Sequence, residues 1–170
     1  MAFDAYWCDM AERIYQLHCL TLLRNKMKRC NSCVTWATGI LSCIFSWTWF
    51  KGTFPPAFCN AIIWGMQVVS IVFPQLRYGE IASALKFAIE DVQKNIADME
   101  RFWLKINEST SDNEIADARH QYNQQYHDIE QKYFGDISLK FSKDIMNQAC
   151  DIRDRYLEER FFDTKSEVKM

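Results

Sequence analysis

The sequence predicts an all-α membrane protein with a two-helix transmembrane hairpin, an N-terminal amphipathic helix and a cytoplasmic helical bundle or coiled coil. Three observations lead to this fold class. Of the 170 residues, the 45 in the segment 32–76 carry one charge, Lys51, whereas the other 125 carry 41. Outside that segment, apolar residues recur at spacings of three and four, the helical period. No stretch alternates as a strand does, and five Gly and three Pro are too few for a β-rich chain.

Composition and charge exclude several classes of protein. Aromatic residues make up 15% of the chain, which is atypical of disorder. Residues 1–20 contain three acidic groups and no apolar core, so we expect no cleavable signal peptide. Seven scattered cysteines do not form a disulfide framework and indicate a reducing compartment. Residues 78–170 have a net charge of −6, so we expect no direct nucleic-acid binding.

Residues 1–31 are predicted to form the amphipathic helix. The apolar positions that repeat at helical spacing are Phe3, Trp7, Met10, Ile14, Leu17 and Thr21. This face can lie on the inner leaflet of a membrane or pack on the cytoplasmic helices. Asp4, Asp9 and Glu12 on the opposite face favour packing over lipid.

The hairpin is predicted over residues 32–76. Its first span, 32–50, has 19 uncharged residues and a helical length of about 28 Å; its second, 54–76, has 23 and about 34 Å. Both suit a hydrocarbon core of about 30 Å. The three-residue connection makes the spans antiparallel neighbours. Two buried helices of a soluble protein are the alternative, but uncharged runs of this length exceed what a soluble core needs.

The flanking charges predict the orientation of the hairpin. Arg24, Lys26, Lys28 and Arg29 precede the first span, and Arg77 follows the second. Because positive charge is retained in the cytoplasm, both termini are expected there and the turn at Lys51 outside.

Small and hydroxyl residues form a stripe along the first span. Thr35, Gly39, Ser42 and Ser46 are spaced four, three and four apart. The second span has its own ridge at Ala57, Ala61 and Gly65. Such faces let helix backbones approach closely, and two helices cannot cover them all, so we expect a homo-oligomer.

Two amides lie within the second span. Asn60 and Gln67 are seven residues apart, on one helical face. They either form interhelical hydrogen bonds that specify packing or line a pore that opens in an assembly. Because the spans contain no ring of charges, any pore would be poorly selective.

A cytoplasmic helical domain is predicted over residues 77–163. Its first helix has four heptads of apolar residues, which predict a coiled-coil stripe for oligomerisation. The candidate stripe residues are Leu85, Ile89, Val92, Ile96, Met99 and Trp103. Ser111 or Asp112 caps a second helix that ends at Gly135. A third apolar stripe runs from Phe141 to Tyr156, and 164–170 is a frayed tail.

The search for chemistry finds isolated features only. Cys30 and Cys33 form one CxxC, without the second pair that a zinc site needs. Arg13 and His18 have an R-x4-H spacing like that of HEPN ribonucleases, and His120 with His127 is a possible metal pair, although a surface pair is the simpler reading. No phosphate loop or hydrolase motif occurs. We expect no enzyme activity, no cofactor and no metal.

The order of parts resembles the SLATT two-transmembrane effectors of bacterial anti-phage defence systems. The resemblance lies in ERIYQLHCLTLLRNKMKRC, the tight hairpin and FPQLRYGEIASALKFAIEDVQ, and covers roughly residues 5–160. It implies a multi-pass protein of the bacterial inner membrane that forms pores or disrupts the bilayer, causing cell death or growth arrest. Since this chain has no fused sensor domain, the resemblance also implies a separate sensor or regulatory partner.

Two other functions remain open from the sequence. A membrane-tethered scaffold would use the coiled-coil stripe to recruit a cytoplasmic protein. Direct recognition of a small nucleotide by the cytoplasmic helices would need a basic pocket, and the sequence shows no obvious one.

Overall fold

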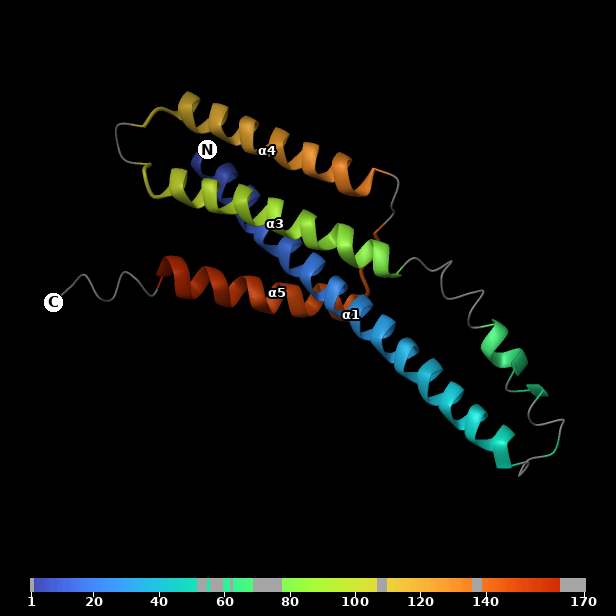
Figure 1. The fold of residues 1–170 in the computed structure, drawn as a ribbon. Helices are drawn as coiled ribbons and strands as arrows, with labels where there is room; N and C mark the ends of the chain where they lie inside the picture. The colour runs from blue at the N-terminus through green and yellow to red at the C-terminus, as the bar shows by residue number, and fades with distance from the viewer. Residues whose placement is uncertain are drawn as a thin grey trace. The chain divides into compact units, whose positions relative to one another are not determined.

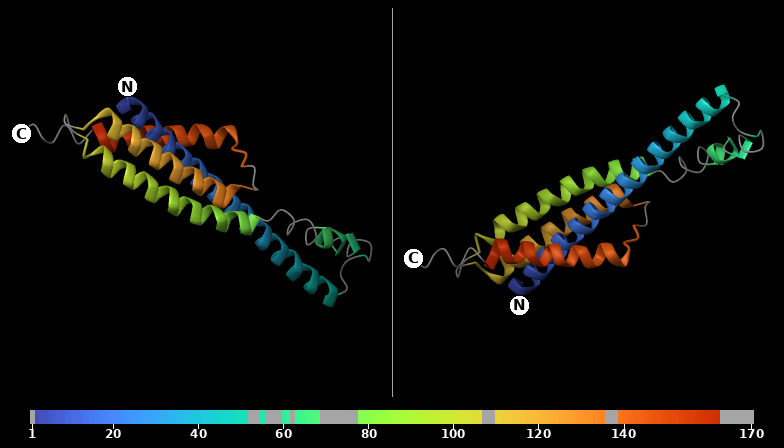
Figure 2. Two further views of the ribbon diagram at one scale, coloured as in Figure 1. Left: turned by 90° about the horizontal axis from the view of Figure 1, so that it is seen from above. Right: turned by 90° about the horizontal axis from the view of Figure 1, so that it is seen from below.

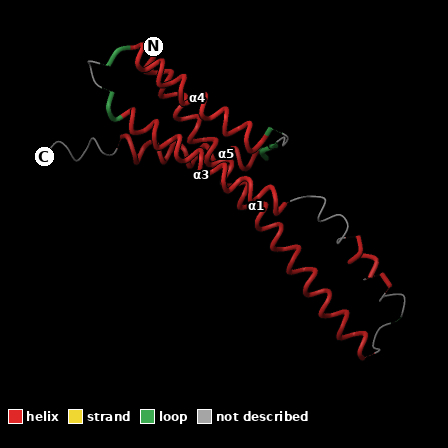
Figure 3. Tube along the Cα trace, turned by 45° about the horizontal axis from the view of Figure 1, so that its top comes forward, coloured by secondary structure: helices red, strands yellow, loops and turns green. Residues whose placement is uncertain are grey.

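The computed structural model describes residues 2–51, 55, 60–61, 63–68, 78–106, 110–135 and 139–162, with the backbone alone at 45, 47–51, 78 and 162. The elements are α1 (Ala2–Lys51), α3 (Tyr78–Trp103), α4 (Asp112–Phe134), α5 (Lys143–Leu157) and a short π-helical segment, η1 (Glu158–Phe162). Within these ranges the chain forms helices and connecting loops and no strand (Figure 3). The predicted all-α class is therefore confirmed.

The chain divides into two units. The first combines residues 1–24 with 84–170, and the second consists of 25–83. In the first unit the start of α1 lies beside α3, α4 and α5, and these helices form a bundle (Figures 1 and 2). The first unit is thus built from both ends of the sequence. The predicted boundary between residues 31 and 32 falls inside α1, which is continuous there.

The start of α1 packs on the other bundle helices, as its acidic residues favoured, and one of them, Asp9, bonds to α4 instead of facing outward. Met10 and Ile14 are buried as predicted, but Phe3 is 43% exposed and Tyr6 is fully buried in its place. The buried face is turned toward Tyr6 because its hydroxyl donates to the carbonyl oxygen of Met99 on α3 at 2.9 Å. A phenol can enter a core only when its hydroxyl finds such a partner.

The caps of α4 agree with the sequence pattern. The Ser111 hydroxyl accepts a hydrogen bond from the Glu114 backbone N–H, and the Glu114 carboxylate accepts one from the Ser111 N–H. This capping box satisfies two backbone donors at once. The helix ends before Gly135, as predicted. Ser142 precedes α5 in the same extended conformation but makes no side-chain capping bond.

The second unit contains the rest of α1 and parts of the predicted second span. α1 ends at Lys51, one residue after the predicted end of the first span. Residues 60–61 and 63–68 are helical, whereas the connection at 52–53, most of 54–76 and the predicted tail 164–170 lie outside the described residues. Among the residues that are described, no helix combines the length and apolarity needed to cross a bilayer.

Candidate functional site

The hydroxyl stripe of the predicted first span is present on α1, and each hydroxyl bonds to its own helix. Thr35, Ser42 and Ser46 donate to the carbonyl oxygens of Asn31, Thr38 and Ser42, at 2.9, 2.8 and 2.9 Å. These bonds join residues i and i−4, a pattern open to Ser and Thr inside helices. The stripe therefore satisfies its own polar groups without a second helix.

Gly39 lies in the middle of this stripe and leaves room beside the helix. A methyl group built on its Cα would meet no described atom within 4 Å outside its own helical turn. Gly65, in the second predicted span, has the same open surroundings. Neither glycine is thus required by a close contact among the described residues, and both faces are accessible to another helix.

Large apolar side chains are exposed around the same stretch of α1. Trp36 is 71% exposed, and Ile40, Leu41 and Ile44 are between 41% and 55% exposed. In the second predicted span Trp64 is 69% exposed. Asn60 and Gln67 are exposed too. A contiguous exposed apolar surface usually marks a contact with a membrane or another protein.

The predicted oligomer stripe on α3 is covered by other helices of its own chain. Leu85, Ile89, Val92, Ile96 and Met99 are at most 6% exposed, and Trp103 is partly buried. Trp103 stacks on Phe3 and packs on Trp7 of α1, with ring centroids 4.3 and 4.9 Å apart. The heptad pattern predicts a helical partner, and within the single chain the bundle provides one.

A polar network between α1 and α4 was not predicted. Arg119 donates from Nε and Nη2 to the two carboxylate oxygens of Asp9, at 2.6 and 3.3 Å, and the Asn123 amide donates to Asp9 at 2.8 Å. Partial burial alone would raise the pKa of Asp9, but these hydrogen bonds and the charges of Arg119 and Arg13 outweigh it and hold the pKa below its usual value. Asp9 is therefore ionised in the folded bundle.

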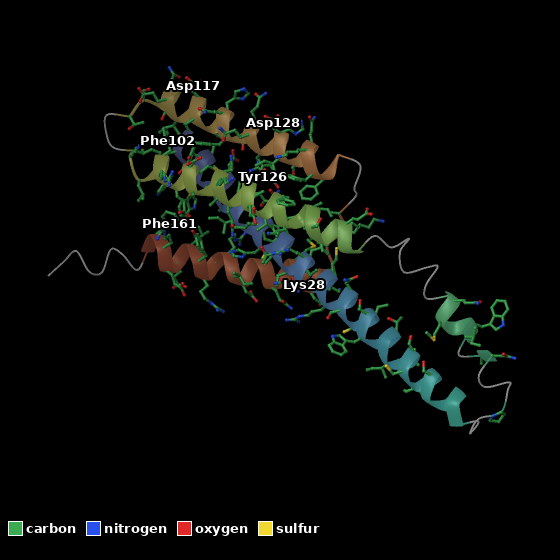
Figure 4. All side chains as sticks on the ribbon, viewed as in Figure 1. Lys28, Phe102, Asp117, Tyr126, Asp128 and Phe161 are labelled. Atoms are coloured by element: carbon green, nitrogen blue, oxygen red, sulfur yellow. The ribbon has the colours of Figure 1, made fainter. Side chains whose placement is uncertain are left out.

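Arg13 extends this network by one helical turn. It donates to the side-chain oxygens of Asn123 and Gln16, both at 3.0 Å, and its guanidinium lies 3.6 Å from the ring centroid of Tyr126 (labelled in Figure 4). The sequence did carry a signal: Asp9 and Arg13 are four residues apart, as are Arg119 and Asn123. Residues four apart lie on one face of a helix, so these two pairs can face each other across a helix interface. These contacts give Arg13 a structural role between α1 and α4.

A second buried contact joins α3 to the C-terminal helices. The Tyr156 hydroxyl donates to the Glu100 carboxylate at 2.5 Å, and Arg160 lies 3.7 Å from the same carboxylate. Burial and the Glu100 hydrogen bond raise the pKa of Tyr156 to about 12. Glu100 is only 8% exposed, so these hydrogen-bond and ionic partners compensate for the burial of its carboxylate.

The bundle contains a pocket of about 420 Å³ beside α1 and α4. Its lining includes Gln16, Leu20, Tyr126, Glu130, Phe134 and Phe141. The volume suits a small ligand, but among the described lining residues the one charged side chain is the carboxylate of Glu130. This does not favour a nucleotide, whose phosphates need cations.

The isolated cysteines and histidines do not come together as a site. Cys30 and Cys33 are exposed free thiols. His120 and His127 are exposed on α4, where His127 bonds to Gln131. In the described part of the chain no group of His, Cys, Asp and Glu has the arrangement of a metal site.

The chain was compared with protein-family models, with curated proteins and with solved structures. None of the three comparisons finds a match. The case for a function therefore depends on the residues and their geometry.

Proposed function

We propose that this chain is a membrane effector of a bacterial anti-phage defence system. It oligomerises in the inner membrane and, on activation, forms a pore or disrupts the bilayer, so that the membrane depolarises and the cell dies or stops growing. The observation that carries the proposal is the 45-residue run 32–76 with a single charge. It contains two uncharged segments of membrane length joined by three residues. The defence role derives from the SLATT-like order of parts.

Two features of α1 support lipid contact around residues 32–50. Trp36, Ile40 and Ile44 expose large apolar surface, which is costly in water and favourable in hydrocarbon. The hydroxyls between them are bonded to their own helix, as a bilayer requires of polar groups. Both features suit a helix surrounded by lipid tails.

Self-association is assigned to the hairpin. The α3 stripe is covered by its own bundle, whereas Gly39 and Gly65 have open space beside them among the described atoms. Small residues without neighbours allow close contact between helices of different copies. Asn60 and Gln67 then either form hydrogen bonds between copies or face a shared lumen.

The bundle is the part that receives the signal from a separate sensor or regulatory protein. A change in its packing would be passed to the spans and would turn their hydroxyl and amide faces toward a lumen. Both termini lie in the cytoplasm in this arrangement, because the basic residues at 24–29 and Arg77 are kept on that side.

Insertion is tested first, by alkaline carbonate extraction of membranes that contain the full chain. We expect the chain to stay in the membrane fraction. Reporter fusions at residue 52 and at the C-terminus should place residue 52 outside and the C-terminus inside. Complete extraction by carbonate would reject the proposal.

Pore formation is tested with a potential-sensitive dye in cells that overexpress the chain. We expect depolarisation by the wild type and its loss in the double variant Asn60→Leu and Gln67→Leu, because the polar lining is removed. Met66→Leu with Val68→Leu is the matched control on the same segment and should depolarise as the wild type does. An unchanged potential with correctly inserted wild type would reject the pore.

The scaffold alternative makes a different prediction for the spans. If the chain only tethers a cytoplasmic partner, an unrelated two-span hairpin should replace residues 32–76 without loss of function. The surface first considered for recruitment, the α3 stripe, is buried. We therefore favour the effector and treat this exchange as the discriminating control.

A further inference from the structure

A cluster of positive charge lies on α1. Lys26, Lys28 and Arg29 are exposed, and among the described residues of their own unit, 25–83, no carboxylate forms an ion pair with them. The sequence explains this, because it contains no Asp or Glu between Glu12 and Glu80. Elsewhere in the described chain exposed cations such as Lys86, Arg101 and Lys132 do lie beside carboxylates. We call Lys26, Lys28 and Arg29 the basic collar.

The three cations of the collar lie at one level along the helix and within an arc of about 160° around it. At about 100° per residue, Lys28 lies about 200° and Arg29 about 300° around the axis from Lys26. Exposed cations spread over such an arc at one level can each meet a different phosphate group.

The length of helix that the collar occupies fits within the headgroup layer of a bilayer. From Lys26 to Arg29 the helix rises about 4.5 Å. The headgroup layer on each side of a bilayer is about 5 to 8 Å thick. On one side of the collar, the next 21 residues of α1, from Cys30 to Phe50, are uncharged, and their first large aromatic residue, Trp36, is exposed. The collar is thus placed where headgroups end and hydrocarbon begins.

We propose that the basic collar binds the phosphate headgroups of anionic phospholipids in the cytoplasmic leaflet. This inference rests on the proposed membrane insertion and adds to it a lipid preference. Lysine and arginine near an anionic leaflet each strengthen binding by a factor of about five. Lys28, labelled in Figure 4, is one of the three residues that supply the charge.

The experiment uses the full chain in nanodiscs of phosphatidylcholine and phosphatidylglycerol. Native mass spectrometry counts the lipids that each protein molecule retains. We expect the wild type to retain phosphatidylglycerol over phosphatidylcholine on the order of 10-fold or more. The variant Lys26→Gln, Lys28→Gln and Arg29→Gln should lose this preference. The matched control, Lys140→Gln, Lys143→Gln and Arg155→Gln, removes three exposed charges from the bundle and should keep it.

The possible outcomes separate this inference from the proposed function. A chain that inserts but retains both lipids equally overturns the inference alone. A chain that carbonate extracts overturns both. If the wild type shifts a single-stranded RNA, the collar variant does not, and neither prefers phosphatidylglycerol, the collar is a nucleic-acid surface and the proposal is wrong.

Discussion

Asp9 shows how one carboxylate fixes the position of α1 on α4. It accepts three hydrogen bonds from Arg119 and Asn123, and its side chain is 22% exposed. Charge-assisted bonds of this kind are stronger than neutral ones and demand specific geometry. Apolar contacts alone would tolerate a sliding of one helix along the other, so this network supplies the register.

We therefore expect Asp9→Asn to lower the free energy of unfolding of the bundle by about 1 to 2 kcal/mol, because Arg119 loses its charged partner. Urea unfolding of the full chain in mild detergent, followed by circular dichroism, measures the change. Asp98→Asn is the control, since Asp98 and Arg101 form an exposed pair and such pairs contribute under about 1 kcal/mol. Equal losses in both variants would contradict a special role for Asp9.

His18 gives the bundle a dependence on mildly acidic pH. Burial lowers the pKa of its imidazole below the usual value of a free histidine. Because the folded-state pKa is below that of the unfolded chain, protonation favours unfolding. The stability is complete above pH 6.5 and is lost as the pH falls through the folded-state pKa.

When the pH is lowered from 7.5 to 5.5, we expect the urea midpoint of the wild type to fall. The midpoint of His18→Gln should fall less. His127→Gln removes an exposed imidazole and serves as the control for the loss of a histidine. A wild-type slope that persists in His18→Gln would assign the pH dependence to another group.

At the scale of single elements, the two N-cap serines differ although their backbone conformations agree. Ser111 has φ −75° and ψ 151°, and Ser142 has φ −73° and ψ 153°. Only Ser111 makes the side-chain capping bond, because Glu114 stands three residues later and completes the box. The Ser142 hydroxyl is buried without a hydrogen-bond partner among the described atoms.

Replacing each serine by alanine separates these contributions. Ser111→Ala should cost about 1 kcal/mol of stability, the usual value of an N-cap bond. Ser142→Ala should cost little or be stabilising, since it removes an unpaired buried hydroxyl. Thermal unfolding of both variants under one set of conditions tests the difference, and a larger loss at Ser142 would refute the assignment.

The sequence predicted which helices exist and which positions are buried better than it predicted which helices pack together. Periodicity predicted the helices, the break before Ser111 and the buried positions from Leu85 to Met99. It could not say that the α3 stripe meets α1, because a heptad pattern is the same for a partner in the same chain or in another. The role of Tyr6 was missed since its burial depends on one carbonyl oxygen 93 residues away.

The candidate site was predictable in part. Spacing alone placed the hydroxyl and small residues of the first span on one helix face. The segment that carries them is helical in α1. Whether Asn60 and Gln67 line a pore stays a prediction, since it depends on neighbours in an assembly. The Asp9 network needed the pairing of α1 with α4, which no local pattern in either segment reveals.

At the scale of the whole molecule, the first unit is discontinuous in sequence. Residues 1–24 supply six side chains to a core whose other described members come from 84–170: Tyr6, Met10, Ile14, Cys19, Leu20 and Leu23. Without them the buried stripe of α3 loses one of its partners and would be exposed to water. The cost of exposing side chains of this size is about 1.5 to 3 kcal/mol each.

A chain of residues 78–170 alone should therefore not form a stable monomer. We expect it to aggregate or to bind a hydrophobic dye, and a peptide of residues 1–24 added in trans should restore helical content and suppress dye binding. The same peptide with Tyr6→Ala and Met10→Ala is the control and should fail. A soluble, cooperatively folded 78–170 monomer without the peptide would contradict this view of the core.

The discontinuity also sets an order of events during synthesis. At about 5 to 20 residues per second, the 59 residues between Arg24 and Ala84 leave the ribosome over several seconds, before any partner of the first helix exists. The apolar middle of the chain must reach its final surroundings while the aromatic N-terminal segment still lacks its partners in the bundle. Any factor that covers the N-terminal helix therefore acts before the bundle forms. The helix that is synthesised last completes the bundle.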